Sequence, residues 1–238
     1  MVERRARIVK KKRFNRRVFS SFSQRFTTIE IRDILVAWLV LSLAFAYVIF
    51  PDVASPVFFI MLIASMIAIS CGFIMHELMH KFTAQKYGYD AAFKIWPFGL
   101  LLAIITALFF GIVFAAPGAT YFEPDPREPF LDPNGFRKRY GEISLAGPRI
   151  NIIFGLIFLG IFLLFWYGHY SVIGLVISGV AGYINFFLAA FNLIPIMPLD
   201  GAKVFNWNKG IWAIYFIFSI TITILIMIGF IPMLRFIP

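Results

Sequence analysis

Cysteine is almost absent from this chain: Cys71 is the single one among 238 residues. A lone cysteine excludes an internal disulfide and any zinc site built from several thiolates, and we expect Cys71 to be a small packing residue. Charged residues are also scarce, at 14% of the chain, and long stretches contain none. The sequence therefore leaves no room for a large soluble domain.

The remaining composition is that of a membrane protein. Hydrophobic residues make up 61% of the chain, 30 residues are Phe, and the mean hydropathy is +0.84. This exceeds what the core of a soluble protein of this length requires. Because helices of about 20 residues and their connections would use up nearly the whole chain, we predict an all-α polytopic membrane protein.

Positive charge is concentrated at the amino terminus. The net charge is +10, and ten Lys and Arg residues in the first 25 positions face only Glu3. A basic run directly before an apolar span typically lies on anionic lipid head groups and fixes orientation, and it is less typical of nucleic-acid binding. A signal peptide fits poorly, because no small-residue cleavage site follows the first apolar stretch. We expect residues 1–30 to form a cytoplasmic or interfacial tail of a multi-pass protein of the cell membrane that binds no nucleic acid.

Five apolar stretches are long enough to cross a bilayer. They cover about residues 31–50, 56–81, 144–167, 171–194 and 211–231. With their connections they predict that residues 31–238 form a single transmembrane domain with five to six spanning helices.

A sixth apolar run, Gly99–Ala116, is ambiguous. Its 18 uncharged residues could cross, but prolines bound it and β-branched and aromatic residues enrich it. If the run does not cross, the basic tail and the basic loops at 82–98, 117–143 and 202–210 share one side of the membrane, as the positive-inside tendency favours. We therefore favour a re-entrant or membrane-embedded element over a sixth crossing.

One apolar stretch ends in a cluster of titratable residues, His76-Glu77-Leu78-Met79-His80. Residues four apart share a helical face, so His76 and His80 can bind one ion while Glu77 holds a water beside it. Zinc at such a site lowers the pKa of the water, and Glu77 can take its proton as the water attacks a carbonyl carbon. The spacing predicts a membrane-embedded zinc metalloendopeptidase with Glu77 as the general base.

A catalytic zinc site needs a third protein ligand at the same membrane depth, and Asp200 is the candidate. It follows a helix that two prolines break within Asn192–Gly201. Broken backbone at membrane depth persists only where it lines a cavity or is satisfied by protein. If residues 99–116 are re-entrant, the helices that lead to His76 and to Asp200 run in the same direction, and both parts of the site meet near the cytoplasmic face.

Two further motifs follow the histidine cluster in order. Gly147-Pro148-Arg149-Ile150-Asn151 begins a span, and Asn192–Gly201 contains the aspartate. This combination, which covers about residues 56–205, resembles the site-2 protease family of intramembrane zinc metalloproteases, in a minimal prokaryotic or archaeal form.

The resemblance implies a function for each motif. His76, His80 and Asp200 would bind one Zn²⁺. Glu77 would be the general base, and Asn192 would help to hold an extended strand of a transmembrane protein substrate. Membrane-embedded β-structure next to the substrate is also implied, and residues 93–122 would form it and pair with the substrate by strand addition.

The sequence leaves some alternatives open. Ala202 and Lys203 replace the second glycine and the arginine with which many members of that family continue the aspartate motif, so the local geometry is in question. Asn151 and Asn192 either bind substrate or only pack helices together. Glu77 could be a buried acid that pairs with a lysine such as Lys81.

The second hypothesis for function is a metal-binding membrane protein without protease activity, either a transporter or an inactive relative of the proteases. Intramembrane His, Glu and Asp residues also mark ion pathways. No duplicated pair of broken helices supports transport, and neither the base nor any ligand is missing. The ligand set alone does not select zinc over cobalt or other divalent ions.

Overall fold

The structure is a computed structural model that describes residues 26–169, 171–229 and 231–234. Most of the predicted basic tail lies outside the described residues. Its binding to lipid head groups therefore stays a prediction.

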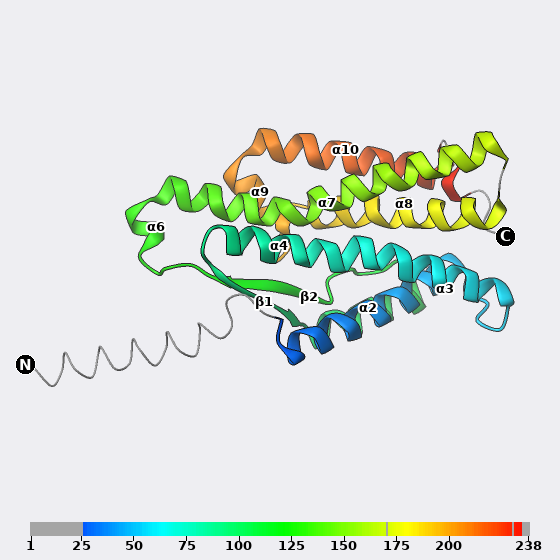
Figure 1. Cartoon of the computed structure of the whole chain (residues 1–238), viewed down its shortest axis with the longest axis horizontal. Helices are drawn as coiled ribbons and strands as arrows, with labels where there is room; N and C mark the ends of the chain where they lie inside the picture. Colours follow the sequence, from blue (N-terminus) through cyan, green and yellow to red (C-terminus); the bar gives the residue numbers. More distant parts are fainter. Residues whose placement is uncertain (1–25, 170, 230, 235–238) are drawn as a thin grey trace, which may run out of the picture.

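Within the described residues, five helices are long and apolar enough to cross a bilayer, which confirms the predicted all-α polytopic class. They are α2 (Thr28–Ile49), the continuous helix Pro56–Lys86, α7 (Pro133–Gly168), α8 (Val172–Asn192) and α10 (Lys209–Met227). Figure 1 shows that they lie along the long axis of the molecule. Besides these spans and α5, which is described below, the described residues form three short helical elements, α6 (Glu128–Leu131), α9 (Asp200–Trp207) and η2 (Pro232–Leu234).

The helix Pro56–Lys86 is not uniform. It consists of α3 (Pro56–Ile69), a π-helical turn η1 (Ser70–Ile74) and α4 (Met75–Lys86). Such turns are rare and often occur at functional sites. Here the π-helical turn lies directly before the histidine cluster.

The third span begins earlier than the sequence predicted. We expected residues 144–167, but α7 starts at Pro133, where the Asp132 carboxylate accepts a hydrogen bond of 2.9 Å from the Gly135 N–H. An acidic N-cap followed by proline is a strong helix start. The 36-residue helix is about 54 Å long, well beyond a hydrocarbon core of about 30 Å. The predicted helix was too short because the prediction followed apolar residues only, whereas a polar segment before residue 144 extends the helix at its amino end.

The ambiguous apolar run, Gly99–Ala116, forms most of a short apolar helix and lies between two paired strands. β1 (Asp90–Ile95) pairs antiparallel with β2 (Gly118–Glu123), and between them lies α5 (Pro97–Phe110). The Trp96 N–H donates to the carbonyl oxygen of Pro117 at 2.7 Å, so the segment leaves and returns at one point. With 14 residues, α5 spans about 21 Å. This geometry matches the re-entrant, partly β-structured element that the sequence favoured.

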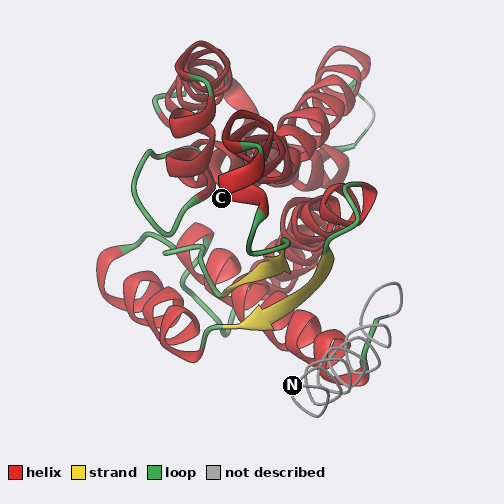
Figure 2. Ribbon diagram, turned by 90° about the vertical axis from the view of Figure 1, so that its left-hand side faces the viewer, coloured by secondary structure: helices red, strands yellow, loops and turns green. Residues whose placement is uncertain are grey.

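α8 is the central helix of the bundle. In the most apolar 18-residue stretch of α8, 67% is buried inside the molecule, compared with 17% in the corresponding stretch of α10. The main core packs α2, α3 and α8 together. Viewed along the helices in Figure 2, the two strands lie on one side of the bundle, and β1 contacts α2.

Candidate metal centre

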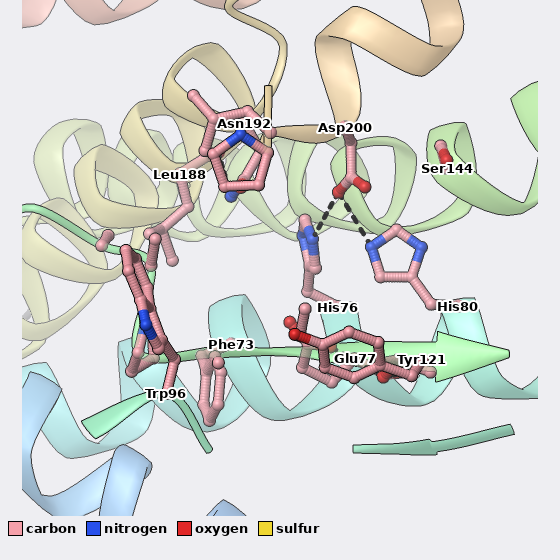
Figure 3. A pocket seen from close by; sticks show the side chains of 18 of the residues that line it. Phe73, His76, Glu77, His80, Trp96, Tyr121, Ser144, Leu188, Asn192 and Asp200 are labelled. Atoms are coloured by element: carbon pink, nitrogen blue, oxygen red, sulfur yellow. Dashed lines mark hydrogen bonds and ion pairs between the residues drawn. The ribbon is translucent and has the colours of Figure 1, made fainter. Parts of the chain in front are cut away.

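Side chains from two distant segments of the chain converge at the amino-terminal half of α4, two from α4 itself and one from the start of α9. Nε2 of His76 lies 3.2 Å and Nε2 of His80 lies 3.0 Å from the same oxygen of Asp200, Oδ2. All the candidate ligand atoms lie within 4.8 Å of one another. Figure 3 shows the two imidazoles directed at the carboxylate, which comes from the opposite side of the site. Two imidazoles and a carboxylate are a ligand set of catalytic zinc sites, in which water completes the coordination.

Gly147 of α7 makes room beside the two histidines. A Cβ atom at this position would lie 2.5 Å from Nε2 of both His76 and His80. Real Cβ atoms do not approach other atoms so closely, so any side chain here would fill the space next to the ligand nitrogens. The residues present therefore fit a small ion at this point.

Hydrogen bonds fix which nitrogen of each ring faces Asp200. Nδ1 of His80 donates to the carbonyl oxygen of Ile143 at 2.7 Å. Nδ1 of His76 lies 2.6 Å from Oδ1 of Asn151, whose amide nitrogen donates to the Gly72 carbonyl oxygen at 2.8 Å. Because that carbonyl can only accept, Oδ1 faces His76 and must accept as well. Both rings therefore carry a proton on Nδ1, which leaves Nε2, the nitrogen that faces Asp200, as the one that can bind a metal.

Asp200 is positioned by close contact between α9 and Leu193, the residue that follows α8. The turn that follows α8 brings the amino end of α9 back against Leu193, and a Cβ at Gly201 would lie 2.1 Å from the Leu193 carbonyl oxygen. Trp212 of α10 donates to the same carbonyl at 2.8 Å. The Asp-Gly pair is thus required by packing, since no larger residue than glycine fits after the aspartate.

Lys203 contacts the second oxygen of Asp200. Its Nζ lies 3.2 Å from Oδ1, the carboxylate oxygen that faces away from the histidines. Burial disfavours the charged form of this lysine, but the Asp200 carboxylate outweighs that effect and raises the pKa of Lys203 above its ordinary value. Lys203 therefore stays a cation beside the candidate metal ligand.

Glu77 is held by a strand of the sheet. The Thr120 hydroxyl in β2 donates to Oε2 of Glu77 at 2.7 Å and lies 3.2 Å from its main-chain carbonyl oxygen. Glu77 does not pair with Lys81, because Lys81 binds Glu30 of α2. The rival interpretation, in which Glu77 is a structural acid paired with that lysine, is therefore wrong.

A cavity of about 260 Å³ opens onto these groups. One wall is the segment Ala115–Phe122, which includes most of β2. His76, Glu77, His80 and Asp200 form another part of the lining, and Figure 3 shows them next to the strand. A peptide in this cavity would lie between the strand and the candidate metal centre.

The two asparagines occupy different places. Asn192 lines the cavity, and its side-chain nitrogen donates to the Leu188 carbonyl oxygen at 3.0 Å. Asn151 is fully buried behind His76 and is absent from the cavity lining. The structure therefore places Asn151 as a partner of His76, whereas the sequence analysis offered substrate binding or helix packing.

Sequence reasoning missed Thr120 and gave no function to Gly147. Thr120 lies 43 residues from Glu77, and no motif connects them. The sequence analysis noted Gly147 only as the first residue of the motif Gly147-Pro148-Arg149-Ile150-Asn151, which contributes to the family resemblance. Its close approach to the histidines becomes visible once α7 is packed on α4.

Three known proteins of similar sequence carry related names. The chain is 41% identical over 191 residues to the "Putative zinc metalloprotease MJ0611" of Methanocaldococcus jannaschii, which covers 80% of this chain and 90% of that protein. It is 30% identical over 157 residues to the "Putative zinc metalloprotease YwhC" of Bacillus subtilis, covering 58% and 65%. The "Zinc metalloprotease MJ0392" of M. jannaschii is 28% identical over 131 residues, covering 55% and 30%. No protein-family model and no solved structure matches the chain.

Proposed function

The chain belongs to the zinc metalloprotease family of these relatives, and we propose that it is an intramembrane member of the site-2 protease type. Its reaction would be the hydrolysis of peptide bonds within or near transmembrane segments of other membrane proteins. The observation that carries this proposal is the position of the metal centre. His76 and His80 lie on a membrane-spanning helix, and the cavity beside them is bounded by a strand.

The residues divide the chemistry between them. His76, His80 and Asp200 would hold Zn²⁺, which supplies polarisation of the scissile carbonyl and activation of a water molecule. Glu77 lines the same cavity, accepts the proton of the attacking water and delivers it to the leaving amine. Asn151 keeps His76 in the tautomer that binds metal.

A helical substrate segment must unwind before its peptide bonds are accessible, because helical carbonyl and N–H groups bind one another in lipid. β2 supports an extended conformation. It pairs with β1 along one edge, and among the described residues no strand pairs with its other edge. A peptide could add there as a third strand, with main-chain hydrogen bonds that do not depend on its sequence. Asn192, across the cavity, is placed to contact the same peptide.

We propose that the site lies near the cytoplasmic face of the cell membrane. The carboxyl end of α4, the amino end of α7 and helix α9 lie at the same end of the molecule in Figure 1. The described segments at this end carry basic residues, among them Lys86, Arg127, Lys138 and Lys209. Positively charged connections favour the cytoplasmic side.

Purified protein in detergent tests the proposal. Wild type should contain about one zinc per chain and cleave a single-span model substrate, while Glu77→Gln should keep the metal and lose cleavage. His169→Ala removes a histidine at the far end of α7 and serves as the control with full activity. Equal cleavage by wild type and Glu77→Gln would remove the assigned base. Metal without any cleavage by wild type would favour the non-proteolytic alternative.

A further inference from the structure

We propose that Thr120 is a positioning residue for Glu77 and that it connects the substrate-binding strand to the catalytic base. This inference rests on the proposed protease function. It assigns to Thr120 a part in the reaction that neither the sequence motifs nor the relatives indicate.

The contact between the two residues is direct. The Thr120 hydroxyl donates to Oε2 of Glu77 at 2.7 Å, which is a short, charge-assisted hydrogen bond. Glu77 is 7% exposed, so few water molecules are available to orient its carboxylate. With Oε2 held by the hydroxyl, Oε1 is left to take the proton from water.

The position of Thr120 in the strand makes the contact dependent on β2. Side chains alternate between the two faces of a strand, and in β2 the half-buried positions are Gly118, Thr120 and Phe122. Thr120 therefore faces α4 with its side chain, while its main chain belongs to the strand whose free edge borders the cavity. A peptide added to that edge would hold the main chain of Thr120 in place, and with it the hydroxyl and Glu77.

A threonine hydroxyl on a strand usually binds water or a neighbouring main-chain group and does not orient a catalytic residue. Thr120 also lies 3.2 Å from the Glu77 carbonyl oxygen, so a purely structural link between β2 and α4 is the rival explanation. The two explanations differ in their kinetics. Misplacement of a base lowers kcat, whereas a loosened strand weakens substrate binding and raises KM.

The test replaces Thr120 by valine, which has the same shape without the hydroxyl. We expect Thr120→Val to lower kcat about 100-fold with KM nearly unchanged. Thr120→Ser, which restores the hydroxyl, should recover activity to within about threefold. Zinc content and unfolding temperature should match those of wild type. Thr223→Val in α10 is the matched control, because it removes a buried hydroxyl that binds only the Ser219 carbonyl at 2.8 Å.

Three results would overturn the proposal: unchanged kcat in Thr120→Val, a rise in KM alone, or no recovery in Thr120→Ser. If the valine variant loses zinc or unfolds, Thr120→Ala is measured as well. Loss of zinc in both variants would make Thr120 a structural residue and refute the proposal. Wild-type turnover is recorded in the same assay. An inactive wild type would count against the protease function itself, whereas an active wild type with an equally active valine variant would refute only this inference.

Discussion

Glu30 of α2 and Lys81 of α4 form an ion pair away from solvent. Nζ of Lys81 lies 2.8 Å from Oε1 and 2.7 Å from Oε2 of Glu30, and each side chain is 3% exposed. The Phe93 N–H in β1 donates to the same carboxylate at 3.1 Å. One carboxylate therefore joins two spanning helices and the sheet, and its partner Lys81 directly follows the candidate metal ligand His80 in the sequence.

Breaking this pair from one side should destabilise the fold strongly. Glu30→Gln leaves the buried Lys81 ammonium without its carboxylate partner, and Lys81→Met leaves the buried Glu30 carboxylate without its cation. We expect each variant to lower the free energy of unfolding by about 3–5 kcal/mol. The double variant should be less destabilised than the sum of the two. Denaturant titration in detergent measures all three. Arg127→Gln, which removes a solvent-exposed pair with Asp125, should leave the unfolding midpoint close to that of wild type. Strict additivity at Glu30 and Lys81 would argue against a coupled pair.

Gly147→Ala should abolish metal binding without unfolding the protein. The added methyl group would lie 2.5 Å from both ligand nitrogens, so the histidines must move apart or the ion must be excluded. Metal analysis and an unfolding curve measure the two effects separately. Gly160→Ala on the same helix is the matched control, because a Cβ there meets nothing within 4 Å. Normal zinc content in Gly147→Ala would show that α7 does not confine the site.

Asn151→Ala should weaken zinc binding while leaving the three ligands in place. Without Oδ1 of Asn151, the proton of His76 is free to move to Nε2, the nitrogen that must bind metal. The expected loss of affinity is about 10- to 100-fold, measured by competition with a zinc chelator. Asn151→Asp keeps an acceptor opposite Nδ1 and should lose less. Equal affinities in Asn151→Ala and wild type would assign this asparagine to helix packing alone.

Lys203 should control how Asp200 binds the ion. The ammonium group of Lys203 binds Oδ1 of Asp200, and Oδ2 is the oxygen that lies nearest both histidines. In Lys203→Met we expect the carboxylate to bind through both oxygens, which would fill the position that water needs. X-ray absorption spectroscopy should then show an additional oxygen neighbour, and Lys203→Arg should retain the wild-type spectrum. An unchanged spectrum in the methionine variant would separate Lys203 from metal coordination.

Much of the fold could be predicted because it depends on local signals. Runs of apolar residues identified all five spanning helices, and the spacing of His76 and His80 follows from the helical repeat. Asp200 was found through the broken helix before it, since intramembrane backbone without hydrogen-bond partners indicates a cavity. The start of α7 was missed because the polar residues from Pro133 onward carry no membrane signal.

The remainder depended on contacts between distant segments. The partner of Lys81 lies 51 residues away in another helix, and the hydroxyl that reaches Glu77 belongs to a strand separated from β1 by a whole helix. A two-strand sheet interrupted by α5 gives only short runs of alternating residues, which apolar neighbours obscure. Side-chain chemistry was therefore predictable within a motif, and the groups that orient the motif were not.

The π-helical turn at Ser70–Ile74 sets the angular position of everything after it. A π-helical turn holds about one residue more than a regular turn, and each residue of a regular helix advances by about 100°, so winding the same residues as regular α-helix would rotate His76 and His80 by about that angle relative to α3. Both imidazoles would then point away from Asp200, although the sequence His76–His80 itself would be unchanged. An intact zinc-binding motif is thus insufficient by itself, because the direction in which it faces is decided one turn earlier.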